Sequence, residues 1–144
     1  MNPIYSYEHR IQYYETDGMR IVHHSNYIRW MEEARIAFME DAGYGYACME
    51  RDGVSIPVLS VSCEYKSMMR FGQTCRIEVR ITKLTPVRMS LEYRFYDADT
   101  NELCGTAASG HCFIGANGHP LSLKKHLPDV FELYHRLVWK PEET

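Results

Sequence analysis

The chain has 144 residues, of which 45% are hydrophobic and 24% charged, and its formal net charge is −3. These values are typical of one soluble globular domain that buries a real core, so we expect residues 1–144 to form a single domain. The slightly negative charge argues against general nucleic-acid binding, although a local basic patch can still hold a phosphorylated ligand.

The N-terminus and the hydropathy of the chain predict neither a signal peptide nor a membrane span. The first four residues lack the charged and apolar regions of a signal peptide, and no apolar run is long enough to cross a bilayer. The five cysteines include no C-x-x-C pair, which favours reduced thiols used mostly as small core residues over a disulfide framework or a metal site. We therefore expect a cytoplasmic protein.

Residues 5–14 predict a half-buried strand. Hydrophobic and polar side chains alternate with the period of two that such a strand requires. The residues that share the face expected to be buried are Tyr5, Tyr7, His9, Ile11 and Tyr13.

A long helix is predicted next, over about residues 27–42. Its apolar positions follow the i, i+3, i+4, i+7 spacing of one buried face, at Tyr27, Trp30, Met31, Ala34, Ala37 and Phe38. Ser25 or Asn26 is the expected N-cap, and Gly43 is the expected stop just past the helix end.

Asp17 lies between this strand and this helix, where chemistry is expected. A helix N-terminus presents unpaired N–H groups and a partial positive charge, which suit the oxyanion that develops during acyl transfer. His24 and Ser25 lie at the helix start, and Asp17 on the preceding loop is close enough to fold back toward a carbonyl held there. An Asp-Gly pair is also a common turn, so a catalytic carboxylate and a simple turn both stay open.

Further residues around Asp17 resemble a known family. The segment Tyr14–Asp17, the segment His24–Tyr27 and the Glu-Glu-Ala-Arg run at residues 32–35 resemble the signature of hotdog-fold acyl-CoA thioesterases of the 4-hydroxybenzoyl-CoA thioesterase type. The resemblance extends from about residue 5 to residue 137. It implies hydrolysis of an acyl-CoA thioester to a carboxylic acid and free CoA, with no cofactor besides the CoA of the substrate and no metal.

The loop before the helix departs from the pattern of that family. Arg20 stands in a stretch where similar proteins more often show a Gly-Val pair, and His23 stands where Tyr is common. The general mechanism implied by the resemblance survives both departures.

The resemblance implies two possible roles for Asp17, which attacks the thioester carbonyl or activates water. An ordinary Asp, with a pKa of about 3.9, is a weak base near neutral pH, whereas direct attack requires an anhydride intermediate. The backbone N–H near His24 would hold the carbonyl oxygen, and the His24 ring either positions the substrate or packs at the helix start. The substrate-contact candidates by nearness in sequence are Tyr14, Ser25, Asn26 and Tyr27.

The rest of the chain predicts four more strands, at about residues 59–66, 75–82, 88–95 and 103–114. A turn at residues 97–101 joins the last two, so adjacent strands should be antiparallel. The last strand is rich in small residues, which would let a helix or an acyl chain approach closely. A short terminal helix is expected after Pro128.

Five strands and one long helix favour an α+β fold in which an antiparallel five-stranded sheet curls around one central helix. This is the hotdog fold that the resemblance implies. Such a sheet leaves an open edge, and in the resembled family the active site lies between two subunits, so we expect a homodimer or a homotetramer.

The CoA phosphates require basic groups, and basic residues at predicted strand ends are Lys66, Arg70, Lys83 and Arg88. Arg70 and Arg88 are the preferred candidates. The sequence sets neither the acyl group nor the choice between CoA and an acyl-carrier protein. A hotdog dehydratase and a non-catalytic acyl-thioester binding module are the alternatives, and Asp17 before the helix start favours the thioesterase over both.

Overall fold

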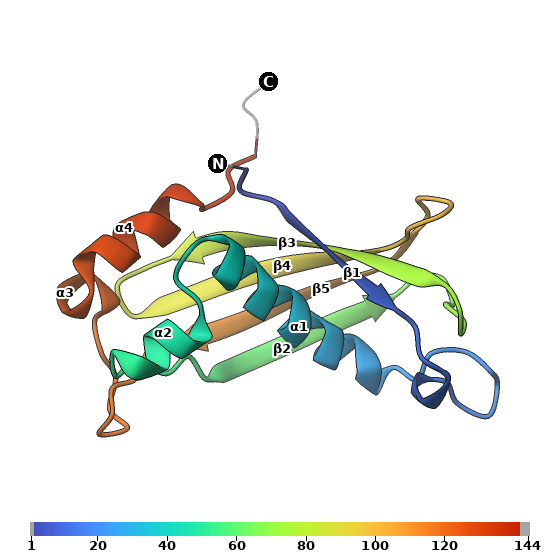
Figure 1. Cartoon of the computed structure of the whole chain (residues 1–144), viewed down its shortest axis with the longest axis horizontal. Coiled ribbons are helices and arrows are strands. Elements are labelled where there is room, and N and C mark those ends of the chain that lie inside the picture. Colours follow the sequence, from blue (N-terminus) through green and yellow to red (C-terminus); the bar gives the residue numbers. More distant parts are fainter. Residues whose placement is uncertain (1, 142–144) are drawn as a thin grey trace.

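The computed structural model describes residues 2–141, so Met1 and residues 142–144 of the expected domain lie outside the described part. One long helix crosses the face of a five-stranded sheet (Figure 1). The elements in chain order are β1 (Tyr5–Arg10), the 3-10 helix η1 (Tyr13–Glu15), α1 (Ser25–Asp41), α2 (Tyr46–Arg51), β2 (Val58–Tyr65), β3 (Thr74–Leu84), β4 (Arg88–Asp97), β5 (Leu103–Cys112), α3 (Leu123–His126) and α4 (Pro128–Arg136).

The sheet has the strand order β1-β3-β4-β5-β2, and every neighbouring pair is antiparallel. The predicted α+β arrangement, with a five-stranded antiparallel sheet and one long helix against it, is therefore confirmed. The helix enters after β1 and lies on the face of the sheet, where it packs against β1, β3 and the outer strand β2.

β1 is shorter than predicted, because the chain turns away after Arg10. Its half-buried face is the predicted one. The Glu15 carboxylate then accepts a hydrogen bond from the Gln12 N–H at 2.8 Å, and the Glu15 N–H donates to the Gln12 carbonyl at 3.0 Å, which closes η1. Tyr13, predicted on the buried face, is 76% exposed in consequence.

α1 begins two residues earlier than predicted and ends where the sequence indicated. Gly43 has a φ of 100°, the left-handed conformation that glycine adopts readily just after a helix. The predicted apolar face is buried except for Ala37, which is half-buried. The same face also buries Arg35, which is 5% exposed and which the spacing of apolar residues does not predict.

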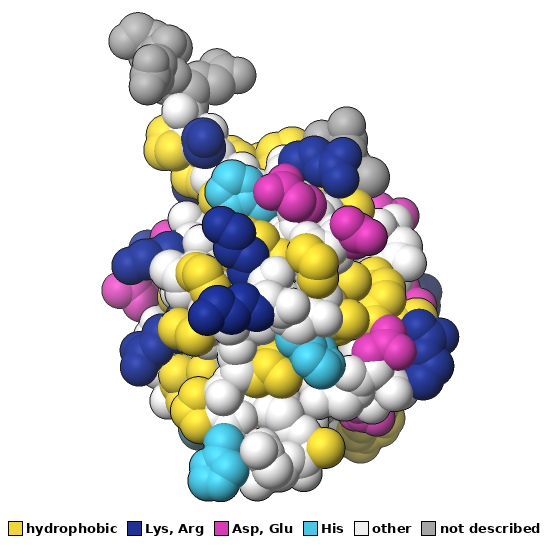
Figure 2. All heavy atoms as spheres, turned by 90° about the vertical axis from the view of Figure 1, so that its left-hand side faces the viewer, with side chains coloured by type: hydrophobic (Ala, Val, Ile, Leu, Met, Phe, Trp, Pro, Cys, Tyr) yellow, Lys and Arg dark blue, Asp and Glu magenta, His cyan; other side chains and the backbone are white. Residues whose placement is uncertain are grey.

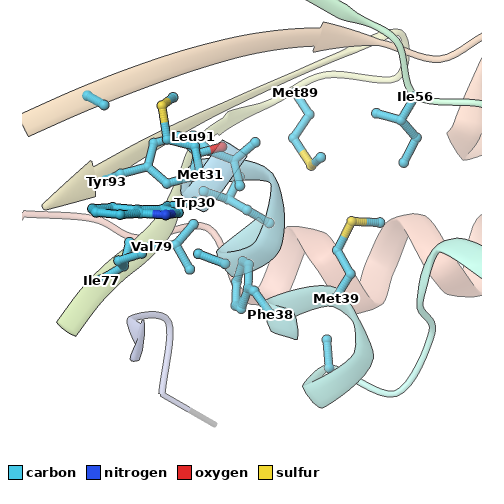
Figure 3. Packing of buried hydrophobic residues seen from close by; sticks show 14 of the residues in the cluster. Trp30, Met31, Phe38, Met39, Ile56, Ile77, Val79, Met89, Leu91 and Tyr93 are labelled. Atoms are coloured by element: carbon cyan, nitrogen blue, oxygen red, sulfur yellow. The ribbon is translucent and has the colours of Figure 1, made fainter. Parts of the chain in front are cut away.

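The core lies between α1 and the sheet (Figure 3). The side chains labelled there that come from α1, β3 and β4 are at most 2% exposed; they are Trp30, Met31, Phe38, Met39, Ile77, Val79, Met89, Leu91 and Tyr93. Each such side chain contributes roughly 1.5–3 kcal/mol on burial, so the helix is held firmly on the sheet. The position of its N-terminus is thereby fixed.

β2 is an outer strand whose apolar side chains are not covered. Val58, Leu59 and Val61 are 52%, 53% and 42% exposed, although the alternation of apolar and polar residues over 59–66 is typical of a strand with one buried face. The difference arises because α1 leaves this margin of the sheet open. An edge strand of this kind offers unpaired backbone groups and apolar side chains to another chain.

The small residues of β5 leave room for the backbone of the neighbouring strand β2. A Cβ added to Gly105 would lie 2.8 Å from the carbonyl oxygen of Glu64 and 3.5 Å from the Phe95 ring. At this position the space that the sequence predicted for a helix or an acyl chain is therefore taken by the backbone of β2.

The helices α2, α3 and α4 lie at the end of the sheet opposite the loop that precedes α1 (Figure 1). Figure 2 shows this end of the molecule, where basic, acidic, histidine and hydrophobic side chains are interspersed. α4 confirms the terminal helix predicted after Pro128, whereas the short helices α2 and α3 were not predicted. No helix in residues 2–141 is long and apolar enough to cross a membrane.

Candidate active site

The loop between η1 and α1 carries Asp17 and is fixed at both ends. Thr16 and Val22 form an antiparallel bridge, and the Asp17 N–H donates to the Ile21 carbonyl at 2.9 Å. Arg20 closes the turn with a φ of 66°. This left-handed conformation costs a residue other than glycine about 1–2 kcal/mol, so the pairing around it must offset that cost.

The Asp17 side chain is part of the turn and also faces a cleft. Its Oδ1 accepts a hydrogen bond from the Met19 N–H at 2.8 Å, which is the turn that the sequence allowed for an Asp-Gly pair. The same carboxylate lines two neighbouring clefts. The turn therefore presents the carboxylate to a cavity and does not bury it.

Most N–H groups in the first turn of α1 already donate a hydrogen bond within the protein. The Ser25 N–H donates to His23 Nδ1 at 3.2 Å, the Asn26 N–H to the His23 carbonyl at 3.0 Å, and the Tyr27 N–H to the His24 carbonyl at 3.3 Å. The prediction that Ser25 or Asn26 caps the helix is wrong, because both residues lie inside the helix and the N-cap position is His24, whose side chain accepts no capping hydrogen bond. Within residues 2–141, the His24 N–H donates to no protein group.

A cleft of ≈ 250 Å³ brings Asp17 and His24 together. Its remaining lining residues are Ile21, Val22, Tyr27, Tyr65, Lys66, Ser67, Met68 and Met69. Mostly apolar walls with a few convergent polar groups are typical of a small-molecule site. The polar side chains that could act on a ligand here include the Asp17 carboxylate, the His24 imidazole and the Lys66 ammonium group.

Tyr65 joins the end of β2 to the start of α1. Its hydroxyl donates to the His24 carbonyl at 3.2 Å, and its ring packs edge-to-face against Tyr27 with centroids 5.0 Å apart. Burial, followed by the neighbouring Cys63 thiol, raises the pKa of Tyr65 to about 12, so the hydroxyl stays protonated at neutral pH. Sequence analysis placed Tyr65 on a strand but did not connect it with the site.

Glu15 anchors the loop that carries Asp17. The sequence analysis did not identify it as a site residue. It is 4% exposed, and its carboxylate accepts hydrogen bonds from the Gln12 N–H at 2.8 Å, His9 Nε2 at 2.8 Å and Trp30 Nε1 at 2.7 Å. Burial alone raises the pKa of Glu15, but these bonds outweigh it and hold the pKa below its ordinary value. A Glu three residues after Gln12, as in a capping box, was the available sequence signal.

A second cleft, of ≈ 510 Å³, lies on the other side of Asp17. It is lined by Tyr13, Tyr14, Thr16, Asp17, Arg20, Arg70 and Phe71. Tyr14 is 81% exposed, and the Tyr13 and Phe71 rings pack edge-to-face at 5.7 Å. Exposed aromatic rings beside two arginines suit a ligand that has both a flat ring and phosphate groups.

Three candidates from the sequence lie outside both clefts. Asn26 is buried, and its Nδ2 donates to the Glu15 carbonyl at 2.8 Å. The Ser25 hydroxyl is within 2.8 Å of His23 Nδ1. Arg88 begins β4 at the far end of the sheet, about 30 Å along the strand from the end nearest Asp17. Lys66, which the sequence analysis ranked behind Arg88, lines the cleft with Asp17.

Comparison with known proteins identifies the family. The family model described as Thioesterase-like superfamily matches residues 11–139. The chain belongs to the thioesterase-like superfamily. The predicted resemblance to hotdog-fold acyl-CoA thioesterases is thus confirmed, and the enzyme class is that of thioester hydrolases.

Three similar proteins illustrate the relationship. A Bacillus subtilis (strain 168) protein with the provisional name acyl-CoA thioesterase YneP is 33% identical over 130 residues, which cover 90% of this chain and 94% of that protein. The acyl-CoA thioester hydrolase YbgC of Escherichia coli O157:H7 is 21% identical over 123 residues, covering 85% and 92%. The structure of the DHNA-CoA thioesterase from Staphylococcus aureus superimposes with a TM-score of 0.88 at 27% identity, covering 93% and 90%.

Proposed function

We propose that this protein hydrolyses acyl-CoA thioesters to a carboxylic acid and free CoA, with Asp17 and the first turn of α1 as its catalytic centre. The observation that carries the proposal is that Asp17 lines one cleft with His24, whose backbone N–H has no partner in the described part of the chain. The names of the similar proteins from Bacillus, Escherichia and Staphylococcus support the substrate class.

In the proposed reaction the thioester carbonyl oxygen accepts a hydrogen bond from the His24 N–H, next to the positive end of the α1 dipole. Negative charge that develops on this oxygen is stabilised there. In one route the Asp17 carboxylate attacks the carbonyl carbon, the CoA thiolate leaves, and water then cleaves the resulting anhydride. In the other, Asp17 takes a proton from water as that water attacks the carbonyl carbon directly.

The first test measures thiol release from a panel of short-chain, long-chain and aromatic acyl-CoAs. Asp17→Asn should lower kcat by about a hundredfold or more, the scale of loss of a principal catalytic group. Asp41→Asn, at the exposed end of α1, is the matched control and should retain the wild-type rate. Wild-type turnover by Asp17→Asn would refute the assigned site, and acyl-CoA binding without any thiol release would favour a binding module.

A single turnover in ¹⁸O-labelled water with excess enzyme separates the two roles of Asp17. If Asp17 activates water, the label appears only in the released acid. If Asp17 attacks the thioester and water then attacks the aspartyl side of the anhydride, the label appears in the Asp17 side chain, where peptide mass spectrometry detects it.

We propose that the second cleft and Lys66 hold the nucleotide end of CoA. The rings of Tyr13, Tyr14 and Phe71 would stack on the adenine, while Arg70 and Lys66 would meet the phosphates. Arg70→Ala should raise KM for acyl-CoA with little change in kcat, and should leave acyl-pantetheine esters, which lack the nucleotide, unaffected. An unchanged KM would remove Arg70 from the site.

The sequence-based proposal for Arg88 is tested in the same series. Arg88 lines neither cleft at Asp17, so we expect Arg88→Ala to raise KM only if a second copy brings Arg88 to a cleft. Acyl-carrier-protein esters form a further arm of the assay, because a carrier protein presents no adenine to the aromatic rings.

We also propose that two or four copies associate through the open edge at β2. Leu59 and Val61 are exposed apolar residues on this edge strand, and association would cover them. Light scattering should show a dimer or tetramer for the wild type and a monomer for Leu59→Glu. Val87→Glu is the control, because Val87 is 43% exposed in the turn between β3 and β4. A monomeric wild type would refute this part.

The proposal places the reaction in the cytoplasm, where the five free cysteines stay reduced. Fractionation of cells that produce the protein, with a cytoplasmic and a periplasmic marker enzyme, tests this location.

A further inference from the structure

A third cavity, of ≈ 280 Å³, opens between the middle of α1 and the first half of β2. Its lining residues are Ile28, Met31, Glu32, Arg35, Tyr46, Ile56, Pro57, Val58, Val61 and Ser109. It shares no lining residue with either cleft at Asp17. The proposed reaction therefore gives this cavity no role.

The wall of the cavity contains one buried positive charge, the guanidinium of Arg35, which is 5% exposed. Its Nη1 donates to the Tyr93 hydroxyl at 3.1 Å, whereas its buried Nε has no hydrogen-bond partner in the described part of the chain. Arginine stays protonated in proteins. Burial of a charge without a counter-charge is costly, so we expect a negative group to complete this arrangement.

The polar groups that Arg35 contacts on the sheet are neutral. The Tyr93 hydroxyl lies 2.6 Å from the Ser109 hydroxyl, which lies 2.8 Å from His111 Nε2. Burial, and then the charge of Arg35, lower the pKa of His111 to about 4, so this ring carries no charge near neutral pH. The sheet therefore supplies hydrogen bonds to this cluster but no counter-charge.

The cavity also contains one carboxylate, that of Glu32, which does not pair with Arg35 of its own chain. The two residues are three positions apart on α1, which places both on the same side of the helix. Within residues 2–141 neither of them forms an ion pair, and Glu32 is exposed. A free anion that enters the cavity is repelled by Glu32, which disfavours a small anionic ligand as the missing partner.

Exposed apolar side chains line the cavity together with these two charges. Ile28 on α1 is 46% exposed, and Val58 and Val61 on β2 are 52% and 42% exposed. Apolar side chains around an arginine are typical of the centre of a protein–protein interface, where arginine is enriched. Val61 also belongs to the edge through which we propose that copies associate, so this association would cover the cavity.

A second copy of the chain offers the missing charge by symmetry. In a twofold assembly a surface patch meets the same patch of the other copy, so a contact of one residue with another is made twice. α1 crosses the sheet next to β2 (Figure 1), so antiparallel pairing of two β2 edges would bring two α1 helices alongside each other in opposite directions. A patch with one positive and one negative group, unpaired within the chain, is then complementary to itself.

Building on the proposed association through β2, we propose that the Glu32 carboxylate of a second copy enters this cavity and binds Arg35, and that Arg35 of that copy binds Glu32 of the first. The carboxylate accepts a hydrogen bond from Arg35 Nε, the donor that has no partner within one chain, and neutralises the buried charge. The apolar side chains around the pair exclude water, which strengthens it. Because both pairs form only at one relative position of the two helices, they also set the register in which the edges meet.

The test measures the dissociation constant of the assembly by analytical ultracentrifugation over a range of protein concentrations. Glu32→Gln leaves two Arg35 groups unpaired in each assembly and should raise this constant about 100-fold or more, as expected when one partner of a charge pair at an interface is removed. Glu32→Arg places like charges opposite each other and should raise it further. Both variants change an exposed side chain, so circular dichroism should show an unchanged fold.

Asp41→Arg is the matched control, because it makes the same change of charge on the same helix. Asp41 is exposed and lies about two and a half turns after Glu32, which places it on the opposite side of α1. The dissociation constant of this variant should stay within about threefold of the wild-type value, as for a surface charge outside the contact.

Mixing two variants shows whether the pair joins two copies. Arg35→Glu should weaken self-association as Glu32→Arg does, because each of these variants carries two like charges in the cavity. In an equimolar mixture every charge finds an opposite one, so native mass spectrometry should show a heterodimer of the two variants. Should Arg35→Glu fail to fold, the Glu32 variants decide the question by themselves.

The outcomes separate the ion pair from the proposals on which it builds. A wild-type assembly whose dissociation constant is unchanged in Glu32→Gln and Glu32→Arg would overturn the ion pair and leave association through β2 standing. A wild type that stays monomeric would overturn both. Absence of thiol release, together with an assembly that depends on Glu32, would overturn the thioesterase function and keep the ion pair.

Discussion

Replacing Glu15 by Gln should destabilise the protein and thereby reveal what holds the Asp17 loop. The Glu15 carboxylate is buried and accepts hydrogen bonds from a backbone N–H, an imidazole and an indole. A Gln side chain has the same shape, but one of its two polar atoms is an NH₂ group that would face donors. The substitution therefore removes at least one hydrogen bond and places the Gln NH₂ group against another N–H donor.

The magnitude follows from these contacts. A hydrogen bond to a charged acceptor contributes about 1.5–3 kcal/mol, and a buried polar group left without a partner costs about 1–3 kcal/mol. Because the neighbouring side chains can relax, we expect Glu15→Gln to lower the free energy of unfolding by about 2–4 kcal/mol. For a chain of this length that corresponds to a Tm lower by roughly 6–15 °C.

The pH dependence of this stability difference shows whether it comes from the charge of Glu15. Because the pKa of Glu15 lies below its ordinary value in the folded protein, its carboxylate stabilises the fold above the unfolded pKa, and this contribution is lost as pH falls through the folded pKa. The free-energy difference between wild type and Glu15→Gln should thus be constant near neutral pH and shrink below about pH 4.5.

Urea unfolding at a series of pH values, followed by circular dichroism, measures both quantities. Glu8→Gln is the matched control, because Glu8 lies exposed on the neighbouring strand β1 and should change stability by less than about 0.5 kcal/mol. Equal stabilities of wild type and Glu15→Gln at pH 7, or a difference that does not depend on pH, would refute the reasoning.

Two further predictions concern the same loop. His23→Ala removes the ring that accepts the Ser25 N–H and should lower the unfolding free energy by about 0.5–2 kcal/mol in urea melts. Ser25→Ala should lower it less, and the reverse order would contradict the importance of this hydrogen bond. Arg20→Gly relieves a φ of 66° and should raise the Tm, with a net gain of about 0.5–1 kcal/mol after the extra chain entropy of glycine. Asn101→Gly, at a φ of 62°, should raise the Tm less, because Asn tolerates this conformation. An unchanged Tm in Arg20→Gly would refute the strain argument.

The elements of the fold were predictable because each has a local pattern. The alternation in β3 and β4 and the helical spacing from Tyr27 to Phe38 follow directly from which face of each element meets the core. The exposed state of β2 was not predictable, since its alternation is that of a half-buried strand. Whether an outer face is covered depends on where α1 crosses the sheet, and this is set by contacts between distant parts of the chain.

The candidate site likewise contains features that the sequence predicts and features that it does not. Asp17 and His24 were predictable because the loop and the helix start that carry them are adjacent in sequence, and the structure brings both to one cleft. The substrate roles assigned to Tyr14, Ser25, Asn26 and Tyr27 remain predictions, although Tyr14 and Tyr27 line clefts beside Asp17. The start of the helix could not be assigned, because Ser25 and Asn26 are common capping residues but lie inside the helix, after the N-cap position His24.

Buried charges are the features that sequence patterns hide most completely, and Glu15 and Arg35 are two examples of opposite sign. Glu15 is surrounded by donors from its own chain, so its charge is satisfied and its role is to hold structure. Arg35 lies in the same helix–sheet layer and receives no such counterpart from the described residues. Since both residues carry comparable costs of burial, the difference in partners points to different purposes. The satisfied charge fixes the loop that bears Asp17, whereas the Nε of Arg35 has no hydrogen-bond partner in the described part of the chain.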